Sequence, residues 1–405
     1  MRHMTIVFDR TEEATMQELQ GITWDHPRGL APMRATAVAV AREHSDVHIT
    51  WTVRSLHAFG AQPLTDMVDR YDLLVIDHPF VGVAAQHGYL LPLDDYLPAA
   101  FLAAQAGQSV GPSHRSYAYA GHQWALAIDA AAQVSAYRPD LLTAADAPVP
   151  RTWSDVLTLA DRRAGPRVAL PLKPVDAISC FFTLCANAGE PACHDITRLV
   201  GRTTGRMALD LLRRVAAAYP DSLNLNPPET LDRMAGSDEI VYAPLIFGYS
   251  NYARPGYARH LVRFTNIPLA TDGGRPRGAL LGGAGLALSA SCRDIPRACA
   301  YAEWVASADC QRTLYVETGG QPGNRVAWTD TAVNAATSNF FRDTLETLDL
   351  SYLRPRYPGF AVFQDEAGQA LNEWLRGTGT ADNLLEHLDE LYIENHARER
   401  EANPT

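Results

Sequence analysis

The sequence predicts an α/β protein built as two domains. Short runs of β-branched and aliphatic residues alternate with longer segments of helical periodicity, as happens when crossover helices join parallel strands. The chain has 405 residues, whereas a single domain mostly has roughly 100–200. Hydrophobic residues make up 47% of the chain and charged residues 20%, which is the composition of a folded protein.

The N-terminal part predicts a βαβαβ unit. Strands are expected at Leu19–Trp24, His48–Val53 and Asp72–Asp77, with helices at Met33–Glu43 and near Leu64–Arg70. A proline follows the first and the third strand, and a residue before proline prefers an extended conformation. The chain is therefore expected to leave both strands as a loop.

Two of these loops carry the most distinctive polar residues. They span Trp24–Gly29 and Asp77–Phe80, and both contain Asp-His-Pro. In an open parallel sheet, ligands bind beyond the carboxyl ends of the strands. Both loops should therefore face one cleft.

The middle of the chain predicts an extended crossing followed by a second set of elements. The crossing and a short helix are expected within Gln123–Leu142, and a helix is expected to begin at Thr152. Thr152 is a suitable N-cap, and Asp155 three residues later completes a capping box. A loop and strand at Arg162–Pro174 and helices at Ser179–Ala188 and Thr203–Tyr219 follow.

The C-terminal part predicts a return to the first domain. After a strand at Glu239–Phe247 and the aromatic loop Gly248–Tyr252, a second crossing is expected at Val262–Ile267. A glycine-bearing strand at Leu280–Ser289 and a helix at Ile295–Ala306 come next, with Pro296 in the first helical turn. The remainder, Phe340–Arg398, is expected to be helical with a break at Tyr352–Phe360.

Three segments in this order resemble a known family. They are Ala127–Leu142 with the following Pro150–Val156, the strand and aromatic loop Ala243–Tyr252, and the stretch from Gly282–Ser289 to Gly319–Gly323. Their order and spacing are similar to those of the extracellular solute-binding proteins of ABC importers, of the carbohydrate type that includes the maltose-binding protein. The resemblance covers nearly the whole chain.

The resemblance implies a periplasmic-binding-protein-like fold, in which hinge segments join two α/β domains with a ligand cleft between them. The domains would comprise residues 4–127 plus 267–327 and residues 128–266 plus 328–398. It also implies a small-molecule solute, an ABC permease as partner, a periplasmic or extracytoplasmic location, and no catalytic residues. We expect a monomer.

The first loop combines four kinds of side chain that suit a polyhydroxylated ligand. The ring of Trp24 could cover the apolar face of a sugar, while Asp25, His26 and Arg28 form hydrogen bonds to hydroxyl groups. The alternative is an ordinary loop in which Trp24 is buried and Arg28 pairs with Asp25.

Other candidate ligand-binding residues follow from position or from the resemblance. Asp77 and His78 end a wholly apolar strand, although Asp77 could instead cap the next helix. The missing side chain of Gly283 would let a backbone or a ligand approach its strand closely. The resemblance adds residues in segments that line the family's cleft: Trp124, Asp129, Tyr249, Asn251, Tyr252, Gln321 and Arg356.

Several classes of function fit the sequence poorly. The net charge of -11 offers no attraction for nucleic acid or an anionic membrane, and every apolar run is too short to span a bilayer. The two Asp-His pairs lack the spacing of a metal site, and we expect no cofactor. The six cysteines do not settle the compartment.

We therefore expect a binding protein, not an enzyme, for a monosaccharide, a polyol or a sugar acid. Three alternatives stay open: a non-sugar organic acid as ligand, an intracellular sensor on the same fold, and an enzyme using His26 or His78 as a base beside Asp25 or Asp77. The segment Thr5–Glu13 has no apolar core of the kind found in export signals. A cytoplasmic location therefore also stays open.

Overall fold

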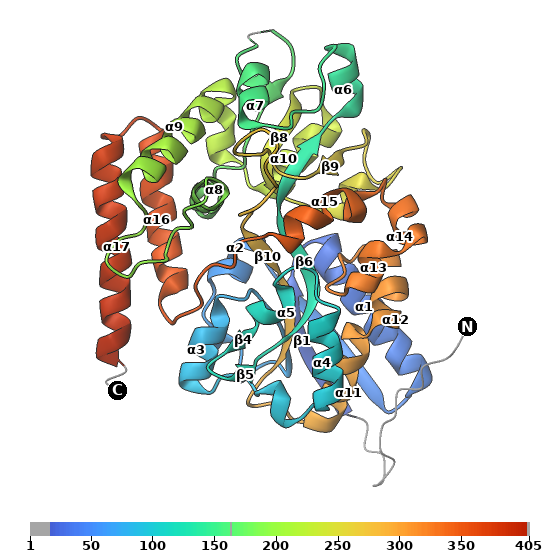
Figure 1. The fold of residues 1–405 in the computed structure, drawn as a ribbon. Coiled ribbons are helices and arrows are strands. Elements are labelled where there is room, and N and C mark those ends of the chain that lie inside the picture. Colours follow the sequence, from blue (N-terminus) through green and yellow to red (C-terminus); the bar gives the residue numbers. More distant parts are fainter. Residues whose placement is uncertain (1–16, 163, 403–405) are drawn as a thin grey trace. The chain divides into compact units, whose positions relative to one another are not determined.

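The computed structural model describes residues 17–162 and 164–402. The segment Thr5–Glu13, considered above for an export signal, lies outside these residues. The chain divides into two compact units, each assembled from several segments (Figure 1). Unit 1 comprises Met1–Ala130, Gly282–Val333 and Arg356–Pro358, and unit 2 comprises Ala131–Leu281, Asn334–Pro355 and Gly359–Thr405.

Unit 1 is an α/β unit around a four-stranded sheet with the order β2-β1-β3-β10. Strands β1, β2 and β3 are parallel to one another, and β10 is antiparallel to β3. Its elements are β1 (Gln17–Trp24), α1 (Pro27–Glu43), β2 (Val47–Arg54), α2 (Leu56–Ala61), β3 (Leu73–Ile76), α3 (Phe80–His87), α4 (Ala99–Gly107), α5 (Ser113–Ser116), β4 (Ala118–Tyr119), β5 (His122–Gln123), β10 (Leu281–Leu288), α11 (Ile295–Ala306), α12 (Ala308–Cys310) and α13 (Arg325–Thr329).

The core of unit 1 lies on both faces of this sheet. Successive side chains of a strand point to opposite faces. Accordingly, Leu73 and Val75 pack in one apolar cluster with α1, β2 and α11, whereas Leu74 and Ile76 pack in a second cluster with α3. All four side chains are fully buried, as expected for an apolar strand covered on both sides.

The first helix begins earlier than the sequence predicted. Helix α1 starts at Pro27, where we expected a loop. Proline occupies the first helical position, whose N–H would have no partner within the helix, so it does not break the helix there. The expected helix near Leu64–Arg70 is also wrong, because the structure has α2 further upstream and a short 3₁₀ turn at Leu64–Asp66.

Unit 2 surrounds strands in the order β6-β8-β7, with β9 paired to β6. Strands β8 and β9 are antiparallel to β6, and β7 is parallel to β8. The elements that lie wholly or partly in unit 2 are β6 (Leu126–Tyr137), α6 (Pro139–Ala144), α7 (Trp153–Ala160), β7 (Arg167–Val168), α8 (Pro174–Asn187), α9 (Arg202–Ala218), α10 (Pro227–Gly236), β8 (Ile240–Phe247), β9 (Arg263–Thr265), α14 (Thr331–Ala336), α15 (Phe340–Asp349), α16 (Phe360–Leu375) and α17 (Ala381–Ala402).

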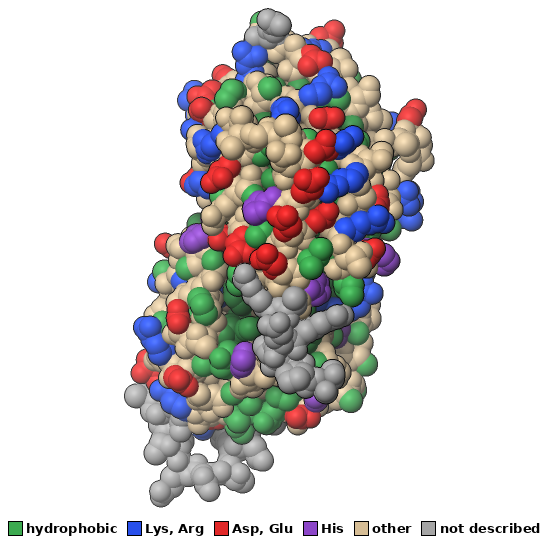
Figure 2. Space-filling model, turned by 90° about the vertical axis from the view of Figure 1, so that its left-hand side faces the viewer, with side chains coloured by type: hydrophobic (Ala, Val, Ile, Leu, Met, Phe, Trp, Pro, Cys, Tyr) green, Lys and Arg blue, Asp and Glu red, His purple; other side chains and the backbone are tan. Residues whose placement is uncertain are grey.

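Helices α9, α16 and α17 lie next to one another on one side of unit 2 (Figure 1). The face that they form carries interspersed acidic and basic side chains (Figure 2). Arg206 pairs with Asp382 at 2.6 Å, and Arg202 lies 3.7 Å from Glu386, so α9 and α17 are joined by exposed ion pairs. The charges on this face are mixed, unlike the continuous basic surface that nucleic acid requires.

The chain passes between the units inside two strands. Strand β6 crosses at Ala130–Ala131 and β10 crosses at Leu281–Gly282. The expected return at Val262–Ile267 differs from the structure, because this segment forms β9 and pairs with β6 inside unit 2. An extended segment alone therefore did not identify the crossing.

Two further observations concern the described residues as a whole. Within the described residues, no helix is both long and apolar enough to cross a membrane. All six cysteines lie in the described part of the chain and are free.

Candidate functional site

The two Asp-His-Pro triplets lie at the same edge of the unit 1 sheet. Strands β1 and β3 pair in parallel, with Ile22 opposite Leu74. Extending this register places Asp25 level with Asp77, directly beyond the carboxyl ends of the two strands. Asp25 is exposed and Asp77 is half-buried. The repeat noticed in the sequence is therefore also a spatial repeat at the edge where ligands bind in α/β sheets.

His26 caps the first helix and stays neutral at physiological pH. Its Nδ1 accepts a hydrogen bond from the backbone N–H of Arg28 at 3.0 Å. Burial, with a smaller contribution from the Arg28 charge, lowers the pKa of His26 to about 4. Because Nδ1 accepts, the proton of the neutral ring is on Nε2. His26 therefore offers an uncharged N–H donor.

A buried arginine that the sequence reasoning missed lies beneath Asp77. Arg54 ends β2 and donates to the Val75 carbonyl at 2.9 Å. Burial lowers its pKa to about 10, which the charge of Asp77 opposes, so Arg54 remains protonated. Its only signal in the sequence is a charged residue at the end of a strand, β2, whose apolar and polar residues alternate. The attraction between Arg54 and Asp77 favours the ionised carboxylate at this edge.

His78 is buried and lies against the carboxylate of Asp77, the preceding residue. Its backbone N–H donates to Asp77 at 2.8 Å, and its Nδ1 lies 3.1 Å from the same carboxylate oxygen. The His78 side chain has no exposed surface. It packs edge-on against Tyr117, with ring centroids 6.3 Å apart. His78 thus supports the loop from within.

Arg28 and Asp129, both predicted to bind ligand, pair with each other. Arg28 Nε donates to Asp129 Oδ2 at 2.8 Å, and a second bond joins Nη2 to Oδ1. The side chains are 5% and 0% exposed. Burial raises the pKa of Asp129, which the Arg28 charge opposes. Arg28 is therefore paired, as in the alternative interpretation, but its partner is Asp129 on β6 and not Asp25.

Trp24 and Trp124, the two tryptophans predicted to bind ligand, belong to the core of unit 1. Trp24 is 4% exposed and packs at a tilt against Phe59, with ring centroids 5.1 Å apart. Its ring also covers Gly29, where an added Cβ would lie 2.4 Å from the indole. Trp124 is 6% exposed, and its Nε1 donates to the Tyr119 carbonyl at 3.0 Å. Both rings are packed on protein atoms.

Gly283 and Gln321 hold other backbone segments close to β6. Gly283 has a φ of 113°, and an added Cβ would lie 2.4 Å from the Asp129 carbonyl oxygen. The close approach predicted for Gly283 is thus made by a backbone. The Gln321 side chain donates to the Ala130 carbonyl at 2.9 Å, and the Ala130 N–H donates back to the Gln321 carbonyl at 3.2 Å. These bonds hold the loop after α12 on β6.

Arg356 organises the loops of unit 1. Its Nη1 donates to the carbonyls of Arg115 at 2.6 Å, Ser116 at 3.2 Å and Ala118 at 2.5 Å. Burial lowers its pKa. Its own carbonyl lies so close to Gly82 that a side chain on that residue would collide with it. The short Arg356–Pro358 segment is thereby fixed to unit 1.

In unit 2, the aromatic loop after β8 forms a 3₁₀ turn at Ser250–Ala253. Tyr249, Asn251 and Tyr252 are 5%, 3% and 3% exposed. Tyr252 donates its hydroxyl to Asp232 at 2.6 Å and packs edge-on against Tyr257. Tyr252 is therefore anchored to α10 and supports the turn.

The first turn of α8 contains a carboxyl group that the sequence analysis did not single out. Asp176 is the third residue of a helix that begins with Pro174. Burial raises its pKa to about 8, while the Lys173 charge lowers it and the Glu229 charge raises it. Lys173 itself pairs with Glu229 at 2.7 Å. At neutral pH Asp176 is mainly protonated and can both donate and accept a hydrogen bond.

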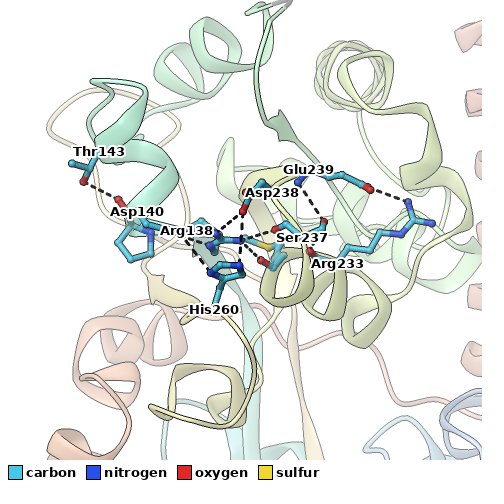
Figure 3. A network of polar contacts seen from close by, with 10 residues as sticks. Arg138, Asp140, Thr143, Arg233, Ser237, Asp238, Glu239 and His260 are labelled. Carbon is cyan, nitrogen blue, oxygen red and sulfur yellow. Dashed lines mark hydrogen bonds and ion pairs between the residues drawn. The ribbon is translucent and has the colours of Figure 1, made fainter.

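A buried arginine also organises part of unit 2 (Figure 3). Arg138 donates to both oxygens of Asp140, at 2.8 and 2.6 Å, and to Asp238 at 2.9 Å. It also donates to the carbonyls of Met234 and Ser237, at 2.7 and 2.6 Å. The Arg138 side chain is 0% exposed, whereas Asp140 and Asp238 are 55% and 70% exposed. One guanidinium thus ties the end of β6 to α10.

Comparison with known proteins defines the fold. No family model and no curated protein sequence matches the chain. Solved structures do match, among them the ABC transporter solute-binding protein of Agrobacterium radiobacter K84 in complex with ribitol. It is 20% identical, with a TM-score of 0.77 over 93% of this chain and 98% of that chain. The fold is that of an ABC-transporter solute-binding protein.

Two further structures with the solute-binding fold are similar over almost their full length. T. maritima MalE3 with maltose bound has a TM-score of 0.78 and 15% identity over 93% of this chain and 98% of that chain. The solute-binding protein of Agrobacterium vitis S4 with D-mannitol has a TM-score of 0.75 and 16% identity over 96% and 100%. The predicted α/β, periplasmic-binding-protein-like fold is confirmed, and these neighbours are binding proteins, not enzymes.

Within the solute-binding fold, the predicted site residues of unit 1 fall into two groups. Asp25, His26 and Asp77 are exposed or half-buried at the carboxyl edge of the sheet. The others are buried or bonded to the protein itself: Trp24, Arg28, His78, Trp124, Asp129, Gln321 and Arg356. The side chains of the first group are accessible to a ligand. Those of the second group pack on or bond to the protein around them.

Proposed function

We propose that this chain is the substrate-binding component of an ABC import system and binds a small polyhydroxylated solute. The observation that carries the proposal is the match of nearly the whole chain to solute-binding proteins whose structures contain ribitol, mannitol and maltose. The permease partner and a location outside the cytoplasm belong to the same proposal. So does domain closure, in which a ligand contacting both units favours the closed state.

The charges at the edge of the unit 1 sheet support a neutral ligand. Asp25 and Asp77 place two carboxylates there, and His26 adds an uncharged N–H donor. Carboxylates and a neutral imidazole suit hydroxyl groups, because the hydroxyl can donate to one and accept from the other. The cations of this region donate to protein acceptors, since Arg28 binds Asp129 and Arg54 binds a backbone carbonyl. We therefore favour a monosaccharide or polyol over an organic acid.

In unit 2, we propose that the partly exposed Asp176 contacts the ligand, together with Tyr249 and Asn251 of the largely buried turn after β8. The aromatic ring of Tyr249 suits the apolar face of a sugar. The protonated Asp176 carboxyl could donate a hydrogen bond to a ligand hydroxyl and accept one from another. Tyr252 would act by anchoring the turn through Asp232.

A thermal-shift screen with ribitol, mannitol, monosaccharides, maltose and sugar acids tests the proposal. A ligand at 100 times its Kd stabilises the native state by about 2.7 kcal/mol. For a unit of about 200 residues this raises Tm by roughly 5–10 °C. Asp25→Ala should abolish the shift without lowering the Tm of the unliganded protein, because Asp25 is exposed.

The matched control is Asp66→Ala, an exposed aspartate of unit 1 that lies in a 3₁₀ turn and is not a proposed ligand contact. It should leave the ligand-induced shift unchanged. No shift with any polyol or sugar would overturn the carbohydrate proposal. A shift with sugar acids alone would replace it by the organic-acid alternative.

A further inference from the structure

A cluster of metal-binding side chains lies in unit 1, outside the candidate ligand site. Asp94 and Asp95 belong to a 3₁₀ turn at Leu93–Asp95, and His122 begins β5. One ligand atom from each of the three residues lies within 4.8 Å of the other two. They come from segments about thirty positions apart, so the fold itself brings an imidazole to two carboxylates.

Backbone contacts hold two members of the cluster in place. Asp94 accepts the backbone N–H of Gln123 at 2.8 Å with one oxygen, and its other oxygen lies 2.8 Å from His122 Nδ1. The β4–β5 hairpin turns through Ala120 and Gly121, whose φ values are 48° and 87°. This tight turn sets His122 beside the 3₁₀ turn before any ion binds, so little ordering is needed on binding.

A hollow of about 560 Å³ opens beside the cluster. Asp94, His122 and His114 line it, together with Gln123 and Arg356. Burial lowers the pKa of His114, so this imidazole is neutral. Arg356 brings the opposing positive charge, but its guanidinium donates to the carbonyls of α5 and the hairpin. The hollow gives a hydrated ion a path to the cluster.

We propose that Asp94, Asp95 and His122 bind a zinc ion. Two carboxylates balance the charge of a divalent cation. A neutral imidazole nitrogen is a ligand that zinc accepts and that calcium and magnesium, which take oxygen ligands, do not favour. On binding, the His122 Nδ1 that faces Asp94 exchanges its proton for the ion, the ring keeps its proton on Nε2, and water completes the coordination. The bound ion ties the β4–β5 hairpin to the 3₁₀ turn.

Calorimetric titration of the full-length, chelator-treated protein with zinc chloride tests this site. We expect one ion per chain and a rise in Tm when zinc is present. Mutation of a residue that only positions a metal ligand typically lowers metal affinity 10–100-fold. Removing a residue that binds the ion directly should lower the affinity at least as much. His122→Ala and Asp95→Asn should therefore each weaken binding by at least about tenfold. Asp94 is left unaltered because it also holds the hairpin backbone.

The matched control is His87→Ala, which removes an exposed histidine of α3 and should leave zinc affinity unchanged. Cobalt(II) gives a second reading, since its visible absorption changes when an imidazole binds and should not change in His122→Ala. Unchanged zinc affinity in His122→Ala, or calcium binding as tightly as zinc, would overturn the proposal. Asp25→Ala should retain zinc binding, which separates this site from the proposed solute site.

Discussion

Both units contain a buried arginine that pairs with aspartate, but the aspartates differ in their exposure to solvent. In unit 1, the Arg28–Asp129 pair is 5% and 0% exposed. In unit 2, Arg138 is 0% exposed, but its partners Asp140 and Asp238 are more than half exposed. A carboxylate in water needs no partner, whereas a buried one does. The same interaction should therefore matter much more in unit 1.

The largest expected effect is the loss of the unit 1 carboxylate. Asp129→Asn keeps the shape of the side chain but leaves the buried Arg28 guanidinium without its opposite charge. Breaking a buried pair from one side costs about 3–5 kcal/mol. We expect the free energy of unfolding, measured by urea denaturation, to fall by this amount.

The matched control makes the same change in unit 2. Asp238→Asn removes an exposed carboxylate that shares Arg138 with Asp140, and exposed pairs contribute about 0.2–1 kcal/mol. Replacing both unit 1 partners, as Arg28→Met with Asp129→Leu, should recover much of the loss. If Asp129→Asn and Asp238→Asn lower the free energy of unfolding equally, the burial of the carboxylate does not determine how much each ion pair stabilises the protein.

The second prediction concerns Arg138 itself. Arg138→Met leaves Asp140 and Asp238 to water but removes the donors to the Met234 and Ser237 carbonyls. Hydrogen bonds to a charged group are worth about 1.5–3 kcal/mol, and the methionine retains part of the apolar packing. We expect urea denaturation to show a loss in that range, smaller than for Asp129→Asn. A loss as large as that of Asp129→Asn would show that the carbonyls, not the carboxylates, dominate.

The sequence predicted local features better than long-range pairs. The capping box at Thr152 and Asp155 is confirmed, because its two hydrogen bonds join residues three positions apart. The pairing of Arg28 with Asp129 spans 101 positions, and no local pattern distinguishes it from a pair with Asp25. Pro27 was misjudged because proline breaks a helix in its interior but suits its first position.

Site residues were harder to predict than the fold, because burial decides their role. Trp24 and Asp25 are neighbours in the sequence, yet the first is 4% exposed and the second is exposed. An apolar residue at a strand end can turn into the core or into a cleft, and only the packing of α1 on the Trp24 ring decides it. The carboxyl of Asp176 was missed for the same reason, since its raised pKa arises from burial.

The smallest expected change for each pH unit comes from the protons that the two units hold. Unit 1 holds a neutral imidazole, His26, whose pKa falls to about 4, and unit 2 holds a neutral carboxyl, Asp176, whose pKa rises to about 8. In the unfolded chain, the pKa of histidine is about 6.5 and that of aspartate is about 3.9. Below about pH 6.5 the unfolded chain takes up the His26 proton, so stability falls as pH falls.

Asp176 has the opposite sign and acts over a wider range. Between about pH 4 and 8 the folded chain holds a proton that the unfolded chain has lost, so stability falls as pH rises, by at most about 1.4 kcal/mol per pH unit. Between about pH 6.5 and 8, Asp176 changes stability with pH and His26 does not. Urea denaturation should show a shallower decline for Asp176→Asn in that window, whereas His26→Gln should change the profile only below it. Parallel profiles of Asp176→Asn and the wild type above about pH 6.5 would contradict a protonated Asp176, because the difference in proton binding would then be absent.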